Sequence, residues 1–209
     1  PGSSFKPFVY AEAFLKGATD QTIVVDEPTN FGIWGGEPYT PQNYDEKFRG
    51  PVTLRNALAQ SLNVPSVKVL ADIAGLQDSI ELAKRMGITT LTQDPSFYGL
   101  AIVLGGGETR LLDMVSAYGV FANAGKRVPP FAIGRIEDSD GSVLEERRSL
   151  AQSVLPAEVT QTITDILSDN QARAPIFGVR SPLYFANARV AAKTGTTQNY
   201  KDGWIMGYA

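Results

Sequence analysis

The residues best suited to covalent chemistry stand at the start of the chain, in the run Ser3-Ser4-Phe5-Lys6. The chain has no His, so a nucleophilic serine needs a base other than imidazole, and lysine is the alternative. At the start of a helix, a spacing of three places the Ser3 hydroxyl and the Lys6 ammonium on one face, beside N–H groups that favour a developing oxyanion. A capping serine followed by a surface lysine is the alternative reading.

A second candidate site lies near the other end of the chain, on a predicted strand. Lys193, Thr194, Gly195, Thr196 and Thr197 follow one another there. Lysine supplies charge, the threonine hydroxyls supply donors, and glycine lets a ligand lie close along the strand edge. The run therefore predicts a site for a terminal carboxylate, and a polar strand end with a glycine bulge is the alternative.

A third element offers a choice between two Ser-x-Asn runs. Ser61-Leu62-Asn63 ends one predicted helical run and precedes Pro65, where the next begins, so the backbone there must turn. Ser168-Asp169-Asn170 follows a predicted helix over Pro156–Leu167, where these residue types are typical of a helix end. Ser61 also lies between the other two motifs in chain order. We therefore predict Ser61 and Asn63 as the functional pair.

These three motifs in this order are those of class A β-lactamases and penicillin-binding proteins. The flanking sequence resembles more narrowly the transpeptidase domain of the bifunctional (class A) penicillin-binding proteins, and the resemblance covers nearly the whole chain. The stretches that carry it are Pro1–Phe8, Tyr39–Tyr44, Gly50–Leu58 running into Ser61, Leu104–Glu108, Leu112–Met114 and Ala117–Gly125.

The resemblance implies a peptidoglycan D,D-transpeptidase. Ser3 would attack the D-Ala-D-Ala bond of a stem peptide, release D-alanine and hold an acyl-enzyme that an amine of a neighbouring strand resolves. Lys6 would take the Ser3 proton. β-Lactams would acylate Ser3 and leave slowly. Peptidoglycan stem peptides and β-lactams are thus the implied ligands, the cell-wall synthesis machinery is a possible partner, and no metal or organic cofactor is implied.

The resemblance also implies roles for the other motif residues. Ser61 would relay a proton toward the leaving amine, with Asn63 orienting Lys6 and the substrate amide. Lys193, Thr194 and Thr196 would hold the terminal carboxylate, and the backbone N–H groups of Ser3 and Thr196 would form the oxyanion hole.

Three other functions remain open from the sequence. A D,D-carboxypeptidase would use water in place of the acceptor amine. A serine β-lactamase would need a glutamate that activates the deacylating water, for which Glu108 is the nearest candidate, although we interpret it as structural. A β-lactam-sensing module that does not turn over would be expected to lose part of the motif set, and Ser3, Lys6, Ser61 and Lys193 are all present.

The elements that must position these residues predict an α/β (α+β), helix-rich fold. It would be a serine β-lactamase-like transpeptidase fold with an antiparallel sheet flanked by helices. Hydrophobic periodicity and Gly or Pro signals predict helices over 3–15, 53–62, 65–74, 78–86, 110–124 and 156–167, strands over 22–25, 189–194 and 204–208, a hairpin over 131–144, and a long ordered loop over 29–52.

Composition limits the partners and the compartment. The net charge of −3 gives no electrostatic reason to expect nucleic acid. No apolar run approaches the roughly 18 residues that span a bilayer, so we expect membrane attachment only through an upstream anchor absent from these residues. We expect residues 1–209 to be one partial domain, truncated at both ends, poorly cooperative in unfolding when isolated, and placed by its family at the extracytoplasmic face of the bacterial membrane.

Overall fold

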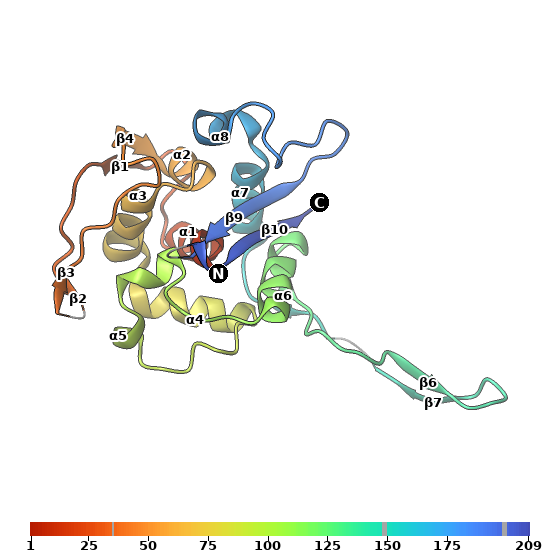
Figure 1. Ribbon diagram of the computed structural model, residues 1–209. Helices are drawn as coiled ribbons and strands as arrows, with labels where there is room; N and C mark the ends of the chain where they lie inside the picture. The colour runs from red at the N-terminus through yellow and green to blue at the C-terminus, as the bar shows by residue number, and fades with distance from the viewer. Residues whose placement is uncertain (35, 148–149, 198–199) are drawn as a thin grey trace.

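The structure of the protein is a computed structural model that describes residues 1–34, 36–147, 150–197 and 200–209. Helices α1 to α8 and antiparallel strand pairs make up the fold (Figure 1). The helices are α1 (Lys6–Leu15), α2 (Leu54–Ala59), α3 (Asn63–Lys68), α4 (Leu76–Met86), α5 (Pro95–Tyr98), α6 (Leu111–Ala122), α7 (Ala157–Ser168) and α8 (Asn170–Phe177). Shorter helical turns are η1 (Gly2–Phe5) and η3 (Leu100–Leu104), which are 3₁₀, and η2 (Val69–Ala74), which is a π-helical turn.

The strands are short and pair as antiparallel ribbons. They are β1 (Ile23–Asp26), β2 (Ile33–Trp34), β3 (Glu37–Pro38), β4 (Gly50–Thr53), β5 (Lys126–Arg127), β6 (Arg135–Glu137), β7 (Val143–Glu146), β8 (Gln152–Ser153), β9 (Ala191–Thr196) and β10 (Gly203–Tyr208). The β9–β10 ribbon crosses the middle of the molecule, with α7 packed on β9 and α6 on β10 (Figure 1). This is the predicted antiparallel sheet flanked by helices, and the α/β fold class is confirmed.

The segment that carries Ser3 and Lys6 lies in the centre of the core. Every residue of α1 from Lys6 to Phe14 is buried, and α1 packs against α2, α4, α7 and η2. Phe8 stacks on Phe121 with ring centroids 5.9 Å apart and meets the edge of Tyr118 at 5.8 Å. An apolar helix surrounded on all sides is held by burial of its whole surface, so residues attached to it are rigidly placed.

Most of the predicted elements are confirmed, and several of their boundaries are corrected. The turn at Gly2–Phe5 is 3₁₀ and the α-helix proper begins at Lys6. Pro7 has no N–H to bond the Ser3 carbonyl in an α-helix, and the Lys6 N–H bonds that carbonyl instead, in the i to i+3 pattern of a 3₁₀ turn. The third helix begins at Asn63 rather than at Pro65. The predicted loop over 29–52 contains the β2–β3 hairpin and the first residues of β4. Propensity missed α8, whose sequence includes Pro175.

The β6–β7 hairpin is unlike the rest of the molecule. It extends away from the body as an arm (Figure 1), and every residue from 131 to 147 is exposed. The predicted turn at Asp138–Gly141 closes it, with Asp138 Oδ1 accepting from the Ser142 N–H at 2.9 Å. We refer to residues 131–147 as the arm.

Candidate active site

Ser3 is the only residue among the first fourteen that is not buried. It lies in the η1 turn, which two hydrogen bonds hold in place. The Ser4 hydroxyl donates to the Pro1 carbonyl at 2.7 Å, and the Tyr118 hydroxyl donates to the Ser4 carbonyl at 2.7 Å. A buried, hydrogen-bonded frame with one partly exposed hydroxyl is the arrangement expected of a presented nucleophile.

Lys6 is fully buried and follows Ser3 by one 3₁₀ turn. Side chains three apart eclipse one another in a 3₁₀ helix, so the two side chains share a face even though the turn is not α-helical. The Lys6 Nζ donates to the Ser61 carbonyl at 2.6 Å, the Leu62 carbonyl at 3.1 Å and Asn63 Oδ1 at 2.8 Å. It also lies 3.4 Å from Ser61 Oγ.

Ser61 occupies the turn between α2 and α3, with φ at 60°. Left-handed backbone is uncommon for a residue with a Cβ and costs on the order of 1 kcal/mol. The conformation points the Ser61 carbonyl at Lys6 and leaves its hydroxyl to accept a bond from the Lys193 Nζ at 2.7 Å. Ser61 Oγ therefore stands between two lysine ammonium groups.

Lys193 lies in β9 with 2% of its surface exposed. Its Nζ also donates to the Thr194 carbonyl at 3.1 Å. Burial, reinforced by the charge of Arg173, lowers the pKa of Lys193 from 10.5 to about 7. Burial and the Lys193 charge likewise lower the pKa of Lys6 well below that of an ordinary lysine. A lysine of lowered pKa can accept a proton near neutral pH, as a general base must.

No carboxylate among the described residues lies within ion-pairing distance of Lys6 or Lys193. A third buried cation, Arg173 of α8, is 2% exposed. Its guanidinium donates to the carbonyls of Leu167 and Leu183, the latter at 3.1 Å. The site is therefore electropositive and suited to an anionic ligand group. No sequence signal marked Arg173, which is one arginine in a polar helix that propensity did not predict.

Close backbone contacts bring the Ser3 turn against β9. A Cβ built on Gly195 would lie 2.1 Å from the Pro1 carbonyl oxygen, and one on Gly2, where φ is +59°, would lie 2.5 Å from the Thr196 nitrogen. Such distances are far inside van der Waals contact, so only glycine fits at both positions. The tight approach places the backbone of Thr196 against Gly2, the residue before Ser3.

A cleft of about 1250 Å³ opens over this arrangement. Its walls come from the η1 turn, the α2–α3 turn, η3 with Gly105 and Gly106, β9, the end of α8 and the segment 39–45, together with Thr197 and residues 200–202 after β9. The motif residues that line it are Ser3, Ser61, Asn63, Thr194, Gly195, Thr196 and Thr197. Lys6 and Lys193 lie behind this wall, buried. The structure thus brings together all nine residues that the sequence singled out.

The alternative Ser-x-Asn run is used for structure. The Ser168 hydroxyl donates to the Thr164 carbonyl at 2.7 Å. Asp169 caps α8 by accepting from the Ala172 N–H at 2.9 Å and pairs with Arg55 at 3.0 Å. Neither residue lines the cleft.

The residues that sequence reasoning did not assign belong to the segment 39–49 and the turn after β9. Asn43 accepts the Asn63 N–H at 2.8 Å, and the Gln42 carbonyl accepts from Asn63 Nδ2 at 2.8 Å. At the cleft mouth the Tyr200 hydroxyl donates to the Tyr44 hydroxyl at 3.2 Å. Two signals pointed to this segment, its richness in Gly, Pro, Asn and Tyr and the family resemblance of Tyr39–Tyr44, but neither assigned a role to a single residue.

Among the described residues, no group of three or more acidic, Cys or His side chains could hold a metal ion. In the described part of the chain, no helix has the length and apolar character needed to cross a bilayer.

A nucleophile turn, two buried lysines and a serine hydroxyl between them are the working parts of the serine–lysine class of acyl-transfer enzymes. Within that class the chain belongs to the penicillin-binding protein transpeptidase family. The family model described as the penicillin binding protein transpeptidase domain matches residues 1–97 and 106–209.

Individual relatives agree with this family. The chain is 39% identical over 211 residues to penicillin-binding protein 1A of Aquifex aeolicus, covering 100% of this chain and 28% of that protein. Among solved structures, penicillin-binding protein 1A from Haemophilus influenzae superposes with a TM-score of 0.80 at 26% identity, over 99% of this chain and 36% of that one. PonA1 of Mycobacterium tuberculosis, solved in complex with penicillin V, superposes with a TM-score of 0.79 at 26% identity, over 100% and 57% of the two chains.

The chain therefore spans little more than a quarter of the length of the Aquifex relative. The family match includes every described element except η3 and the end of α5, which fall in the short interval between its two matched ranges.

Proposed function

We propose that this protein is a peptidoglycan D,D-transpeptidase that cross-links stem peptides through an acyl-serine intermediate and is inhibited covalently by β-lactams. The observation that carries the proposal is the position of the Ser61 hydroxyl, 2.7 Å from the Lys193 Nζ and 3.4 Å from the Lys6 Nζ, beside a cleft onto which Ser3 opens. Residues 1–209 would act as one domain of a longer enzyme working at the extracytoplasmic face of the membrane.

Acylation begins at Ser3. Lys6, whose pKa is lowered by burial and by Lys193, takes the proton from the Ser3 hydroxyl as its oxygen attacks the carbonyl of the terminal D-Ala-D-Ala bond. The negative charge that develops on the carbonyl oxygen would be stabilised by the N–H groups of Ser3 and Thr196. The close contact between Gly2 and the Thr196 backbone supports this assignment.

Ser61 protonates the leaving group. The hydroxyl of Ser61 passes a proton to the amine of the released D-alanine and is resupplied from the lysine on either side. Lys193, with the hydroxyls of Thr194, Thr196 and Thr197, binds the terminal carboxylate of the peptide, or the equivalent carboxylate of a penicillin. Deacylation reverses this sequence, with the amine of a second stem peptide replacing D-alanine.

Two alternatives differ in how the acyl-enzyme is resolved. A β-lactamase needs a glutamate beside the acyl-enzyme to activate water. Glu108 is exposed and does not line the cleft, and no other described glutamate lines it. A D,D-carboxypeptidase would use the same site with water as the acceptor. The two activities are told apart by adding an acceptor amine and measuring the product. A transpeptidase forms a cross-linked dimer, and a carboxypeptidase forms the free acid.

The proposal is tested by labelling the full-length protein with a fluorescent penicillin, beside Ser3→Ala and Ser168→Ala. We expect labelling to disappear with the first substitution and to persist with the second. Labelling that persists in Ser3→Ala would overturn the proposed nucleophile, and rapid release of hydrolysed penicillin would favour the β-lactamase.

A further inference from the structure

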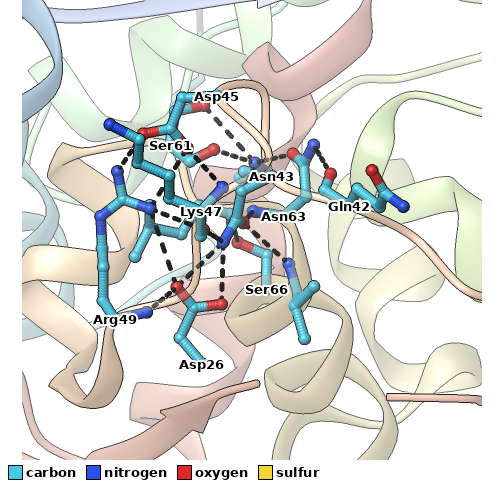
Figure 2. Close-up of polar contacts among 12 residues, drawn as sticks. Asp26, Gln42, Asn43, Asp45, Lys47, Arg49, Ser61, Asn63 and Ser66 are labelled. Atoms are coloured by element: carbon cyan, nitrogen blue, oxygen red, sulfur yellow. Dashed lines mark hydrogen bonds and ion pairs between the residues drawn. The ribbon is translucent and has the colours of Figure 1, made fainter. Parts of the chain in front are cut away.

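We propose that Asp26 and Asn43 are positioning residues that determine which atom of the Asn63 amide faces Lys6. The inference deepens the proposed function and rests on it, because it assumes that Lys6 is the base. It is carried by an unbroken chain of hydrogen bonds that runs from Asp26 through Asn43 to Asn63 (Figure 2) and on to Lys6.

The chain of hydrogen bonds begins at a buried acid. Asp26 ends β1 and has no exposed surface. Its two carboxylate oxygens accept from Asn43 Nδ2 at 2.8 and 2.9 Å. The backbone N–H of Arg49 donates to Oδ2 at 3.1 Å, and the Arg49 guanidinium lies 3.8 Å from the same oxygen. A carboxylate only accepts, so the nitrogen end of the Asn43 amide must face it.

The orientation of Asn43 follows directly. Its nitrogen also donates to the Lys47 carbonyl at 2.8 Å, which is again an acceptor only. Its oxygen therefore faces the start of α3, where it accepts from the N–H of Asn63 at 2.8 Å and of Val64 at 3.4 Å. A flipped amide would set NH₂ against two N–H donors and oxygen against a carboxylate, so one orientation is allowed. With 3% of Asn43 exposed, water cannot relieve the mismatch.

The orientation of the Asn63 amide depends on Asn43 and its neighbour Gln42. Its backbone is anchored by Asn43 Oδ1, and its Nδ2 donates to the carbonyl of Gln42, the residue before Asn43, at 2.8 Å. Its Oδ1 is thereby left to accept from the Lys6 Nζ at 2.8 Å.

The polarity of that last contact matters for catalysis. An amide oxygen accepts an N–H of Lys6 and leaves the lone pair of the neutral amine free to take the Ser3 proton. An amide nitrogen in the same place would donate to that lone pair and occupy it, or would repel the ammonium form. The hydrogen-bond network thus keeps Lys6 available as a base, through groups that do not touch the substrate.

The test measures acylation of the full-length protein by a fluorescent penicillin, with the maximal rate and the half-saturating concentration determined separately. The isosteric changes Asp26→Asn and Asn43→Asp each break the donor–acceptor complementarity of the network. Each is expected to lower the maximal rate about ten- to a hundredfold, the range expected when a reacting group is misplaced. The half-saturating concentration should stay within about twofold, because ligand binding by Lys193 and Thr194 is untouched.

The double variant D26N/N43D supplies a rescue. An amide at position 26 can donate to a carboxylate at position 43, which can still accept the N–H of Asn63. Because the Lys47 carbonyl still loses its donor, the double variant is expected to recover part of the rate lost in the single variants, which gives a measurable coupling between the two positions.

Asp113→Asn is the matched control. Asp113 is 8% exposed, accepts from the N–H and hydroxyl of Thr89 at 2.8 and 2.6 Å, and does not line the cleft. It should lose stability without losing acylation rate. Single variants that acylate as fast as Asp113→Asn at equal folded fraction, or that change only the half-saturating concentration, would overturn the inference. If the penicillin does not acylate the wild-type protein, the proposed function fails as well. The wild-type measurement alone therefore distinguishes this outcome from a failure of the inference about Asp26 and Asn43.

Discussion

The residues behind the cleft and the residues of the arm differ in how far their charged side chains are removed from water. Behind the wall of the cleft, Lys6, Lys193 and Arg173 are each at least 98% buried, since their exposed fractions are 0%, 2% and 2%. These cations donate hydrogen bonds to carbonyl and hydroxyl oxygens. In the arm, charged residues such as Arg135 and Glu137 form an ion pair at the surface, with about half of each side chain exposed.

The difference has an energetic meaning. Burying a cation without a counter-ion destabilises the folded protein, and hydrogen bonds to carbonyls offset only part of that cost. An exposed ion pair contributes at most about 1 kcal/mol. The protein therefore carries buried, unpaired cations where the proposed acyl-transfer chemistry needs a lysine of lowered pKa. It carries no such cations in the arm, where every residue is exposed.

Removing the buried base should produce the largest effect. Lys6→Met keeps the length of the side chain and is expected to lower penicillin acylation by about a thousandfold, the contribution typical of a general base. The free energy of unfolding should fall by about 1–3 kcal/mol, because the buried oxygens of Ser61, Leu62 and Asn63 lose their donor. Stopped-flow acylation and urea unfolding measure the two quantities. Acylation at the wild-type rate would show that the burial of Lys6 has no catalytic role.

Burial of the Lys193 charge should make the free energy of unfolding depend on pH. The pKa of Lys193 is about 7 in the folded protein against 10.5 ordinarily, so above pH 7 the unfolded chain binds the extra proton. The free energy of unfolding should therefore rise with pH from about 7 toward 10, by on the order of a few kcal/mol. Urea unfolding across this range should show a smaller rise in Lys193→Met. Equal curves for the two proteins would contradict the shifted pKa.

Arg173 should tune the same group less strongly. Its charge lowers the pKa of Lys193, so Arg173→Met should raise that pKa and keep Lys193 protonated to higher pH. Non-covalent penicillin binding at about pH 8.5 should strengthen roughly three- to tenfold. Arg173→Lys, which retains the charge, is the control and should leave the pH profile of binding near that of the wild type. A profile that moves in both variants would assign the effect to packing instead.

The arm should contribute least. Replacing 135–146 by a short Gly-rich turn is expected to change the free energy of unfolding by less than about 0.5 kcal/mol and to leave penicillin acylation unchanged. Tyr118→Phe, which removes one buried hydroxyl bonded to the Ser4 carbonyl, should cost about 1 kcal/mol. Urea unfolding of both variants makes the comparison, and a larger loss from the arm than from one core hydroxyl would reverse it.

The sequence determined the local structure and the identity of the motif residues. Helix ends marked by Gly75 and Gly87 and the turn of the arm at Asp138–Gly141 were readable because they depend on a few neighbouring residues. The absence of His, with the order of Ser3, Ser61 and Lys193, indicated serine–lysine chemistry before any contact was known.

Only the tertiary structure decided how those residues meet. The sequence already favoured Ser61 over Ser168, from its place between the other two motifs. The position of the Ser61 hydroxyl between Lys6 and Lys193, and the support from Asp26 and Asn43, depend on contacts between distant parts of the chain. Local pattern carries no information about such contacts, because their energy comes from groups brought together only when the core packs. The lowered pKa of each lysine has the same origin, since burial and a neighbouring charge are properties of the folded protein alone.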